Sequence, residues 1–381
     1  MNRYAAALSL HPTPVEAVGE VAGEILDRFD GDRPDLLVAF ASPHHVGAFE
    51  DMAGGLRKLL EPSVFVGGTA VSIAGGGREI EGAPALSIFA ATFTHGRVSA
   101  LALESLDTPD GMTILGWPDD VESAGTLLML ADPYSFPMPD FLRLVNARAP
   151  ELTIVGGIAS AAAGPGGNRL VCNEQITTSG AVAVMLSEEI PVRPVVSQGC
   201  RPIGLPYTVT RAERNHIYEL GGVSAMERLQ ELVVAADESE RELMRSGLHV
   251  GLVVDEHKLD FARGDFLVRN LLGADQRNGA IAVGDAVQVG QTVQFHVRDA
   301  GAADEDLRVL LQKVDGAAAL LFTCNGRGTQ MFTAPDHDTG LIERNLGPIP
   351  LAGAFCAGEI GPIGGRNFLH GFTASLAVFS Q

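Results

Sequence analysis

Apolar residues along the chain recur in a fixed order of strand-like and helix-like patterns. A short continuous apolar run predicts a buried strand, and apolar residues spaced three and four apart predict a helix. The first example is an apolar run at 36–40, a helical pattern from Phe49 to Leu59, and a second run that enters Gly67 and Gly68. This order of strand, helix, strand and glycines predicts one structural unit.

The same order returns twice further along the chain. Each copy ends in a glycine-rich junction, written VFVGGTAVSIAGGG, TIVGGIASAAAGPGG and PLAGAFCAGEIGPIGG, which another apolar run follows. Chance βα patterning is the alternative to internal duplication. The later copies are expected at 127–130, 141–145 and 154–157, and at 318–323, 342–346 and 351–353; the runs after the three junctions are 85–90, 181–186 and 374–379.

A crossover that contains a helix makes two strands parallel, whereas the shorter glycine-rich connection allows an antiparallel return. The sequence therefore predicts a mixed α/β (α+β) fold. We expect two domains with mixed, largely antiparallel sheets flanked by helices, built from repeated strand-helix-strand-strand units.

The region between the second and third copies follows a different pattern. A helix is expected from Gly222 to about Arg245, followed by mostly β structure. A further helix at 307–314, which Asp304 or Glu305 would cap, precedes the third copy. We place the domain boundary near Gly221, which divides the chain into residues 1–221 and 222–381.

Composition and charge limit the classes of partner. The chain has 381 residues, of which 46% are hydrophobic and 19% charged, with a formal net charge of -20. That balance is typical of a folded protein, and the negative field disfavours nucleic acid and anionic membranes as partners. No long apolar run or secretory signal is evident, so we expect a cytoplasmic protein without a membrane span. Its cysteines are expected to be reduced, with no metal bound.

Candidate binding residues gather near the C-terminus. The segment CAGEIGPIGGRNFLHGFTAS places Cys356, Glu359, Arg366 and His370 among glycines. Small residues leave room for a ligand that polar side chains would orient. The alternative is a structural corner in which Glu359 pairs with Arg366.

Two further groups follow predicted strands, where side chains point into a crevice of an α/β sheet. FTCNGRG supplies Asn325 and Arg327, and SQGCRPIG supplies Cys200 and Arg201. An arginine fork suits a carboxylate ligand. Internal salt bridges are the alternative for both arginines.

Other polar residues have simpler interpretations. Residues 336–338, Asp-His-Asp, suit metal ions by type, but a solvated turn that starts the next helix fits their adjacency better. Cys356 with His370 is the one close candidate pair for nucleophilic catalysis, although a buried cysteine is usually a small hydrophobe. His44 and His45 are expected to be surface or capping residues.

Several stretches resemble those of FIST proteins, which join an N-terminal and a C-terminal FIST domain. They are VGGIASAAAG, SQGCRPIG, LVRNLLGADQRNGAIAVGD, FTCNGRG and CAGEIGPIGGRNFLHGFTASLAVF. The resemblance implies a sensory role in which a small ligand such as an amino acid is bound. The family's C-terminal pattern falls on Asn325, Gly326, Arg327, Gly358, Glu359, Ile360, Gly361, His370 and Thr373.

The expected function is thus a cytosolic sensor of an amino-acid-like metabolite that passes its signal to a separate signalling protein. Enzyme activity and a cofactor are not expected. The expected ligand-binding residues are Cys200, Arg201, Asn325, Arg327, Cys356, Glu359, Arg366 and His370. The alternatives are a cysteine-dependent hydrolase or transferase using Cys356 and His370, a haem-binding sensor, and a protein-interaction module.

Overall fold

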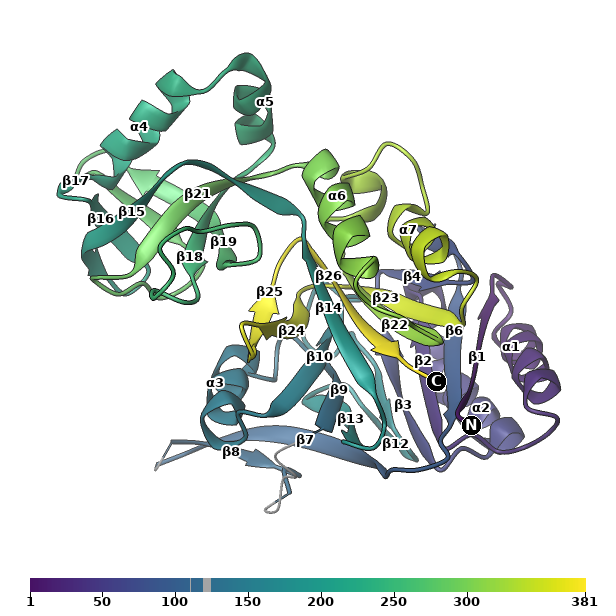
Figure 1. Ribbon diagram of the computed structural model, residues 1–381. Coiled ribbons are helices and arrows are strands. Elements are labelled where there is room, and N and C mark those ends of the chain that lie inside the picture. The colour runs from purple at the N-terminus through teal and green to yellow at the C-terminus, as the bar shows by residue number, and fades with distance from the viewer. Residues whose placement is uncertain (110, 119–124) are drawn as a thin grey trace. The chain divides into compact units, whose positions relative to one another are not determined.

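The computed structural model of the protein describes residues 1–109, 111–118 and 125–381. The chain forms two compact units, which are described here one at a time. The first consists of residues 1–197, 307–369 and 373–381, and the second of residues 198–306 and 370–372. The first unit contains mixed sheets and the second an antiparallel sheet, both with helices, so the predicted mixed α/β fold class with largely antiparallel sheets is confirmed (Figure 1).

The first unit contains the three predicted repeats. All three share a parallel strand pair joined by a helix, then a hairpin and a returning strand. The first repeat has β1 (Arg3–Ser9), α1 (Pro14–Arg28), β2 (Leu36–Ala41), a 3-10 helix (Pro43–Ala48), α2 (Phe49–Leu60), β3 (Val64–Thr69), β4 (Ser72–Gly75), β5 (Arg78–Glu81) and β6 (Leu86–Thr92).

The second and third repeats follow the same plan. The second has β7 (Val98–Thr108), β8 (Gly111–Leu115), β9 (Gly125–Ala131), α3 (Met138–Arg148), β10 (Leu152–Ile158), β11 (Leu170–Cys172), β12 (Gln175–Thr177) and β13 (Ala181–Ser187). The third has β14 (Val192–Gln198), α6 (Ala300–Leu311), β22 (Ala318–Cys324), a 3-10 helix (Gly328–Gln330), α7 (His337–Leu346), β23 (Leu351–Cys356), β24 (Glu359–Ile363), β25 (Arg366–His370) and β26 (Thr373–Phe379).

Strand pairing in the three repeats agrees with the predicted mixed sheets. β2 and β3, β9 and β10, and β22 and β23 are parallel pairs. The returning strands β6, β13 and β26 each run antiparallel to the first strand of their own pair. The three sheets are therefore copies of one arrangement, and internal duplication explains them better than chance patterning.

Each repeat completes its sheet with a hairpin taken from another repeat. The β4–β5 hairpin of the first repeat pairs with β23 of the third, β11–β12 of the second with β3 of the first, and β24–β25 of the third with β10 of the second. The exchange closes a ring, because every repeat gives one hairpin and receives another. Aromatic contact between repeats, such as the edge-to-face pair of Phe40 and Phe322 at 5.9 Å, fills the shared core.

The second unit is an antiparallel barrel with two helices. β15 pairs with β21 on one side and with β16 on the other, so the strand order β15-β21-β18-β19-β20-β16 closes on itself. Its elements are β15 (Cys200–Glu213), β16 (His216–Leu220), β17 (Val223–Ser224), α4 (Ala225–Ala235), α5 (Glu238–Ser246), β18 (Leu248–Val253), β19 (Phe266–Asp275), β20 (Ala280–Val283) and β21 (Thr292–Arg298).

Two predicted helices in this region were wrong in detail. The single helix expected from Gly222 to Arg245 is broken before Asp237, whose side chain caps α5 by accepting from the Glu240 N–H at 2.8 Å. The helix expected at 307–314 begins earlier, at Ala300, because Asp299 accepts from the Ala302 N–H at 3.0 Å and starts it.

The compact units also divide the chain differently from residues 1–221 and 222–381. Residues 307–369 and 373–381 carry the third repeat and pack with the first two, although they follow the barrel in sequence. The barrel is thus an insertion into the third repeat, between β14 and β22.

One glycine in each repeat allows the parallel pair to form. Gly67, Gly156 and Gly353 lie opposite Ala39, Met129 and Leu321. A Cβ on these glycines would lie 2.2, 1.9 and 2.3 Å from the carbonyl oxygen of the opposite residue, closer than any real contact. This close backbone approach explains why glycine recurs at the same point of all three copies.

We expect Gly156→Ala to destabilise the protein by about 1–3 kcal/mol, because the added methyl group forces the parallel strands apart. Gly19→Ala is the matched control. Gly19 is exposed on α1 with no atom within 4 Å of an added Cβ, so alanine should stabilise its helix by about 0.5–1 kcal/mol. Urea unfolding measures both changes, and an unchanged midpoint for Gly156→Ala would contradict the close approach.

Candidate functional site

The third repeat carries a carboxyl group where the other two repeats carry aliphatic side chains. The strand position after the recurring glycine pairs with Ile73 in one sheet, Leu170 in the second and Glu359 in the third. All three side chains are fully buried. The fold therefore accepts an apolar residue at this position, and packing alone does not require the carboxyl group of Glu359.

Glu359 is only partly satisfied by hydrogen bonds. Its Oε2 accepts from the Thr373 N–H at 3.1 Å, whereas Oε1 has no hydrogen-bond partner in the described part of the chain. Burial raises the pKa of Glu359 well above its ordinary value, and the hydrogen bond from the Thr373 N–H, Cys324 and Arg327 offset this effect only in part. The raised pKa favours the protonated carboxyl form, which can both donate and accept a hydrogen bond.

Arg327 is fully buried and is already paired. Its Nε and Nη2 lie 2.8 and 2.7 Å from the two oxygens of Asp338. Burial acts to raise the pKa of Asp338, but the Arg327 guanidinium outweighs it and holds that pKa well below its usual range. Thr323 donates to the same carboxylate at 2.7 Å. The guanidinium fork that was predicted to bind a ligand carboxylate is thus occupied by an internal salt bridge, as the alternative held.

Two cysteines lie beside these groups at the ends of β22 and β23. Cys324 and Cys356 are opposite each other in the parallel register. Burial raises the pKa of the Cys356 thiol well above its ordinary value. A protonated thiol is a poor nucleophile, so this environment does not favour the hydrolase alternative. The other residue of the candidate catalytic pair, His370, belongs to the second unit.

The remaining predicted residues have separate surroundings. Asn325 and Arg366 are exposed, and the Arg366 guanidinium lies 5.6 Å from the Phe368 ring centroid. Glu359 therefore does not form the corner ion pair with Arg366. In the second unit Cys200 is buried, and Arg201 forms ion pairs with Asp299 at 2.7 Å and Glu240 at 3.5 Å. Arg201 and Arg327 thus both form the internal salt bridges that were the alternative to ligand binding.

The hairpin exchange adds a residue that the sequence did not indicate. Glu79, on β5 of the first repeat, is buried against α7 of the third, where its Oε1 accepts from the Thr339 N–H at 2.9 Å. Its Oε2 has no partner among the described residues. Burial and the nearby Asp338 carboxylate raise the pKa of Glu79 to about 7. Nothing in the local sequence could reveal this contact, because its two sides are about 260 residues apart.

Two sequence predictions about polar residues were wrong. Asp338 is not in a solvated turn but is 1% exposed against Arg327, because the exchanged hairpin covers the start of α7. His45 is not a surface residue, since the 3-10 helix after β2 buries it, and neither ring nitrogen has a hydrogen-bond partner within the described ranges. Burial lowers the pKa of His45, so its ring is favoured in the neutral form.

The described residues offer no group of three or more His, Cys, Asp or Glu side chains that could hold a metal ion. Across the described ranges, no helix is both long enough and apolar enough to cross a membrane.

Comparison with known proteins identifies the family. The FIST N domain matches residues 35–223, and the FIST C domain matches residues 225–362. An uncharacterized protein of Mycobacterium bovis is 43% identical over 374 residues, which cover 97% of this chain and 96% of the relative. An uncharacterized protein of Mycobacterium tuberculosis is 42% identical over 383 residues, 99% of each chain.

These matches define the class as a signal transduction sensory protein. The chain belongs to the FIST family, with a FIST N and a FIST C domain, as the sequence motifs indicated. The junction between the two domain matches lies inside the sequence of the barrel unit, so family segments and compact units do not coincide.

Glu79 should make stability depend on pH. Its pKa is about 7 in the folded protein and near 4.5 ordinarily, so the stability it contributes is present below pH 4.5 and lost as pH rises through 7. Glu79→Gln should remove this loss, which amounts to about 3 kcal/mol. Unfolding at pH 5 to 8 measures it. Glu16→Gln, on the exposed face of α1, controls for the loss of one charge, and parallel pH profiles of wild type and Glu79→Gln would refute the effect.

Substitutions of Arg327 and Asp338 should have strongly non-additive effects on the free energy of unfolding. Asp338→Leu leaves a buried guanidinium without its partner and should cost about 3–5 kcal/mol. Arg327→Met combined with Asp338→Leu removes both charges and should cost less than Asp338→Leu alone. Urea unfolding of both single variants and the double variant gives the coupling free energy. Additive losses would show that the two side chains do not depend on each other.

Proposed function

We propose that the protein is a cytoplasmic sensor that binds a small amino-acid-like metabolite at Glu359. The observation that carries the proposal is the buried carboxyl group at a position where the other repeats have Ile73 and Leu170. Leaving a buried polar group without a partner costs about 1–3 kcal/mol. A ligand that supplies the missing partner for Oε1 would remove that cost.

The chemistry around Glu359 supports a polar, hydrogen-bonding ligand. The protonated carboxyl group can donate to a ligand carboxylate or carbonyl oxygen and accept from an amine or amide. The buried Arg327–Asp338 pair acts on Glu359 electrostatically but presents no free charge, because its two charges are paired with each other. The side chains of Cys324 and Cys356 next to Glu359 are small and polarizable. Amino acids and related amides carry the required groups.

The position of Glu359 also connects binding to a change of shape. Glu359 is fully buried, so a ligand reaches it only when the surrounding structure opens. It begins the exchanged hairpin β24–β25, which pairs with β10 through only two residue pairs, whereas β4 and β11 pair with their sheets through three. This hairpin has the shortest ladder, and a ligand at its first residue would favour one state of its attachment. A separate signalling protein would read that state.

A thermal-shift screen of amino acids, their amides and related amines tests the proposal. A ligand at 100 times its Kd should stabilise the wild type by about 2.7 kcal/mol. Glu359→Leu reproduces the residue of the second repeat and should abolish this response. It also removes both an unsatisfied group and one hydrogen bond, so its own free energy of unfolding should stay within about 2 kcal/mol of the wild type.

Glu104→Gln is the control, because it removes an exposed carboxylate on β7 of the second repeat. It should respond to the ligand as the wild type does. Full ligand stabilisation of Glu359→Leu would place the binding site elsewhere. The absence of any stabilising metabolite for the wild type would reject the sensor proposal itself.

A further inference from the structure

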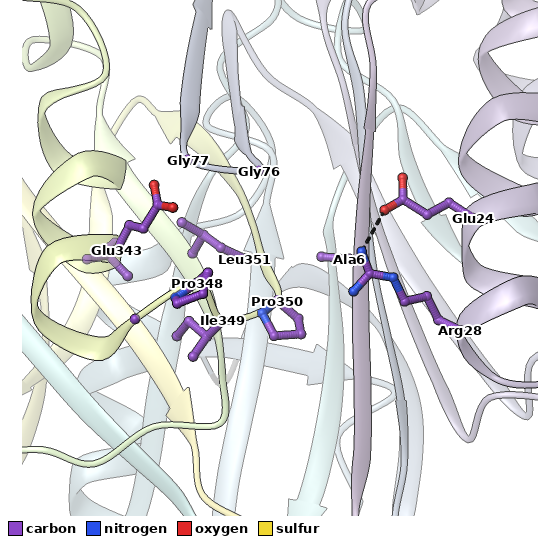
Figure 2. Close-up of a pocket in the computed structure, with 12 residues that line it drawn as sticks. Ala6, Glu24, Arg28, Gly76, Gly77, Glu343, Pro348, Ile349, Pro350 and Leu351 are labelled. Carbon is purple, nitrogen blue, oxygen red and sulfur yellow. Dashed lines mark hydrogen bonds and ion pairs between the residues drawn. The ribbon is translucent and has the colours of Figure 1, made fainter.

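A cavity of about 230 Å³ lies within the first unit, and Glu359 is not among the residues that line it (Figure 2). It is bordered by the turn of the β4–β5 hairpin, the end of α7 with the loop to β23, and α1 with β1. Figure 2 shows Glu343 beside Gly76 and Gly77 on one side, and Glu24 with Arg28 on the other. Residues of the first and third repeats thus form this cavity together.

Of the three charged side chains that line the cavity, Glu343 is the one without an ion-pair partner among the described residues. Glu24 and Arg28 neutralise each other in an ion pair of 3.2 Å on α1. Glu343 has no ion pair or hydrogen bond to its carboxylate among the described side chains, and one oxygen would lie 2.7 Å from a Cβ on Gly77. The cavity therefore carries a net negative charge beside the hairpin turn.

The equivalent contact in the first repeat is a completed ion pair. There, Arg57 of α2 pairs with Glu174 in the turn of the hairpin received from the second repeat. Arg57 and Glu343 are at equivalent positions in the last turns of α2 and α7. The Arg57 carbonyl accepts from the N–H of Glu61, which ends α2, and the Glu343 carbonyl accepts from the N–H of Gly347, which ends α7. In the third repeat the turn residue is Gly77, which has no side chain to offer. A cation from outside the chain would complete the pair.

The backbone around Glu343 also favours a cation. The end of α7 presents helix carbonyl groups and the negative end of its dipole. Pro348 and Pro350 in the following loop have no N–H, and the Ile349 N–H is used by the Gly347 carbonyl at 2.8 Å. Hydrogen-bond donors for an anion are therefore scarce. The side chains of Ile349 and Leu351 give the cavity an apolar wall.

We propose that this cavity is a second binding site, which takes a small organic cation. The ammonium group lies against Glu343, and a short alkyl or aryl body covers Ile349, Leu351 and the prolines. The volume exceeds what a bare metal ion needs, and one unpaired carboxylate is too few ligands for such an ion. The site does not depend on Glu359, so its test is independent of the proposed metabolite site.

Calorimetric titration of the full-length protein with 2-phenylethylamine tests this site. The amine should bind in the millimolar range, and 2-phenylethanol, its neutral analogue, should bind about two- to fivefold more weakly, as expected for one exposed ion pair. Glu343→Gln should weaken amine binding by the same factor and leave the alcohol unaffected. Raising the salt concentration should also weaken the amine, because the pair is exposed.

Glu151→Gln removes an exposed carboxylate just after α3 and should leave amine binding unchanged. Circular dichroism and thermal unfolding establish that Glu343→Gln is folded. Three results would overturn the proposal: equal binding of amine and alcohol, unchanged amine binding by folded Glu343→Gln, or tighter binding of phenylalanine than of the amine. The last would show that the ligand's carboxylate is also recognised, for which Arg28 in the cavity lining offers a cation.

Discussion

The exchange of hairpins among three repeats is the interaction on which the first unit depends. A parallel strand pair leaves the outer edges of β3, β10 and β23 with unpaired N–H and C=O groups, which invite non-native pairing. Each edge is covered by a hairpin from another repeat. No repeat therefore contains its own complete sheet. Stability must be shared around the ring. The two strands that flank the inserted barrel, β14 and β22, both pair with β26 of their own repeat, so the insertion leaves the exchanged edge at β23 untouched.

The residues that maintain the fold of the repeats differ from those that supply a polar group to the exchanged sheets. The recurring glycines Gly67, Gly156 and Gly353 maintain the close parallel pairs in all copies. The side chain that each hairpin delivers to the neighbouring sheet is free to differ, and only Glu359 among the three is polar. Burying the Glu359 carboxyl group lowers the stability of the third repeat. The apolar residues at the equivalent positions of the other two repeats help to offset this loss.

Local pattern predicted most of the elements, because parallel strands, their helix and the returning strand are all encoded by nearby residues. The glycine-rich junctions were recognised, but their role as exchanged hairpins was not, since strand partners far apart in sequence leave no periodic signal. The same limit applies to the site. Glu359 was selected from its local composition, whereas Glu79 and Asp338 become buried only through the exchange. Arg327 was found by type, but its partner 11 residues away was assigned to solvent.

Among the described residues, two carboxyl groups combine a raised pKa with one unpartnered oxygen, and both belong to exchanged hairpins. Glu79 enters with β5 and Glu359 with β24, and each is costly to bury as a carboxylate. A proton or a hydrogen-bonding ligand that satisfies either group favours the attached hairpin over the detached one. By linkage, whatever loosens that hairpin must weaken the binding of the proton or ligand to the same extent. The hairpins are thus the elements on which a proton or a ligand would act, because each of these two carries a buried carboxyl group with one unpartnered oxygen among the described residues.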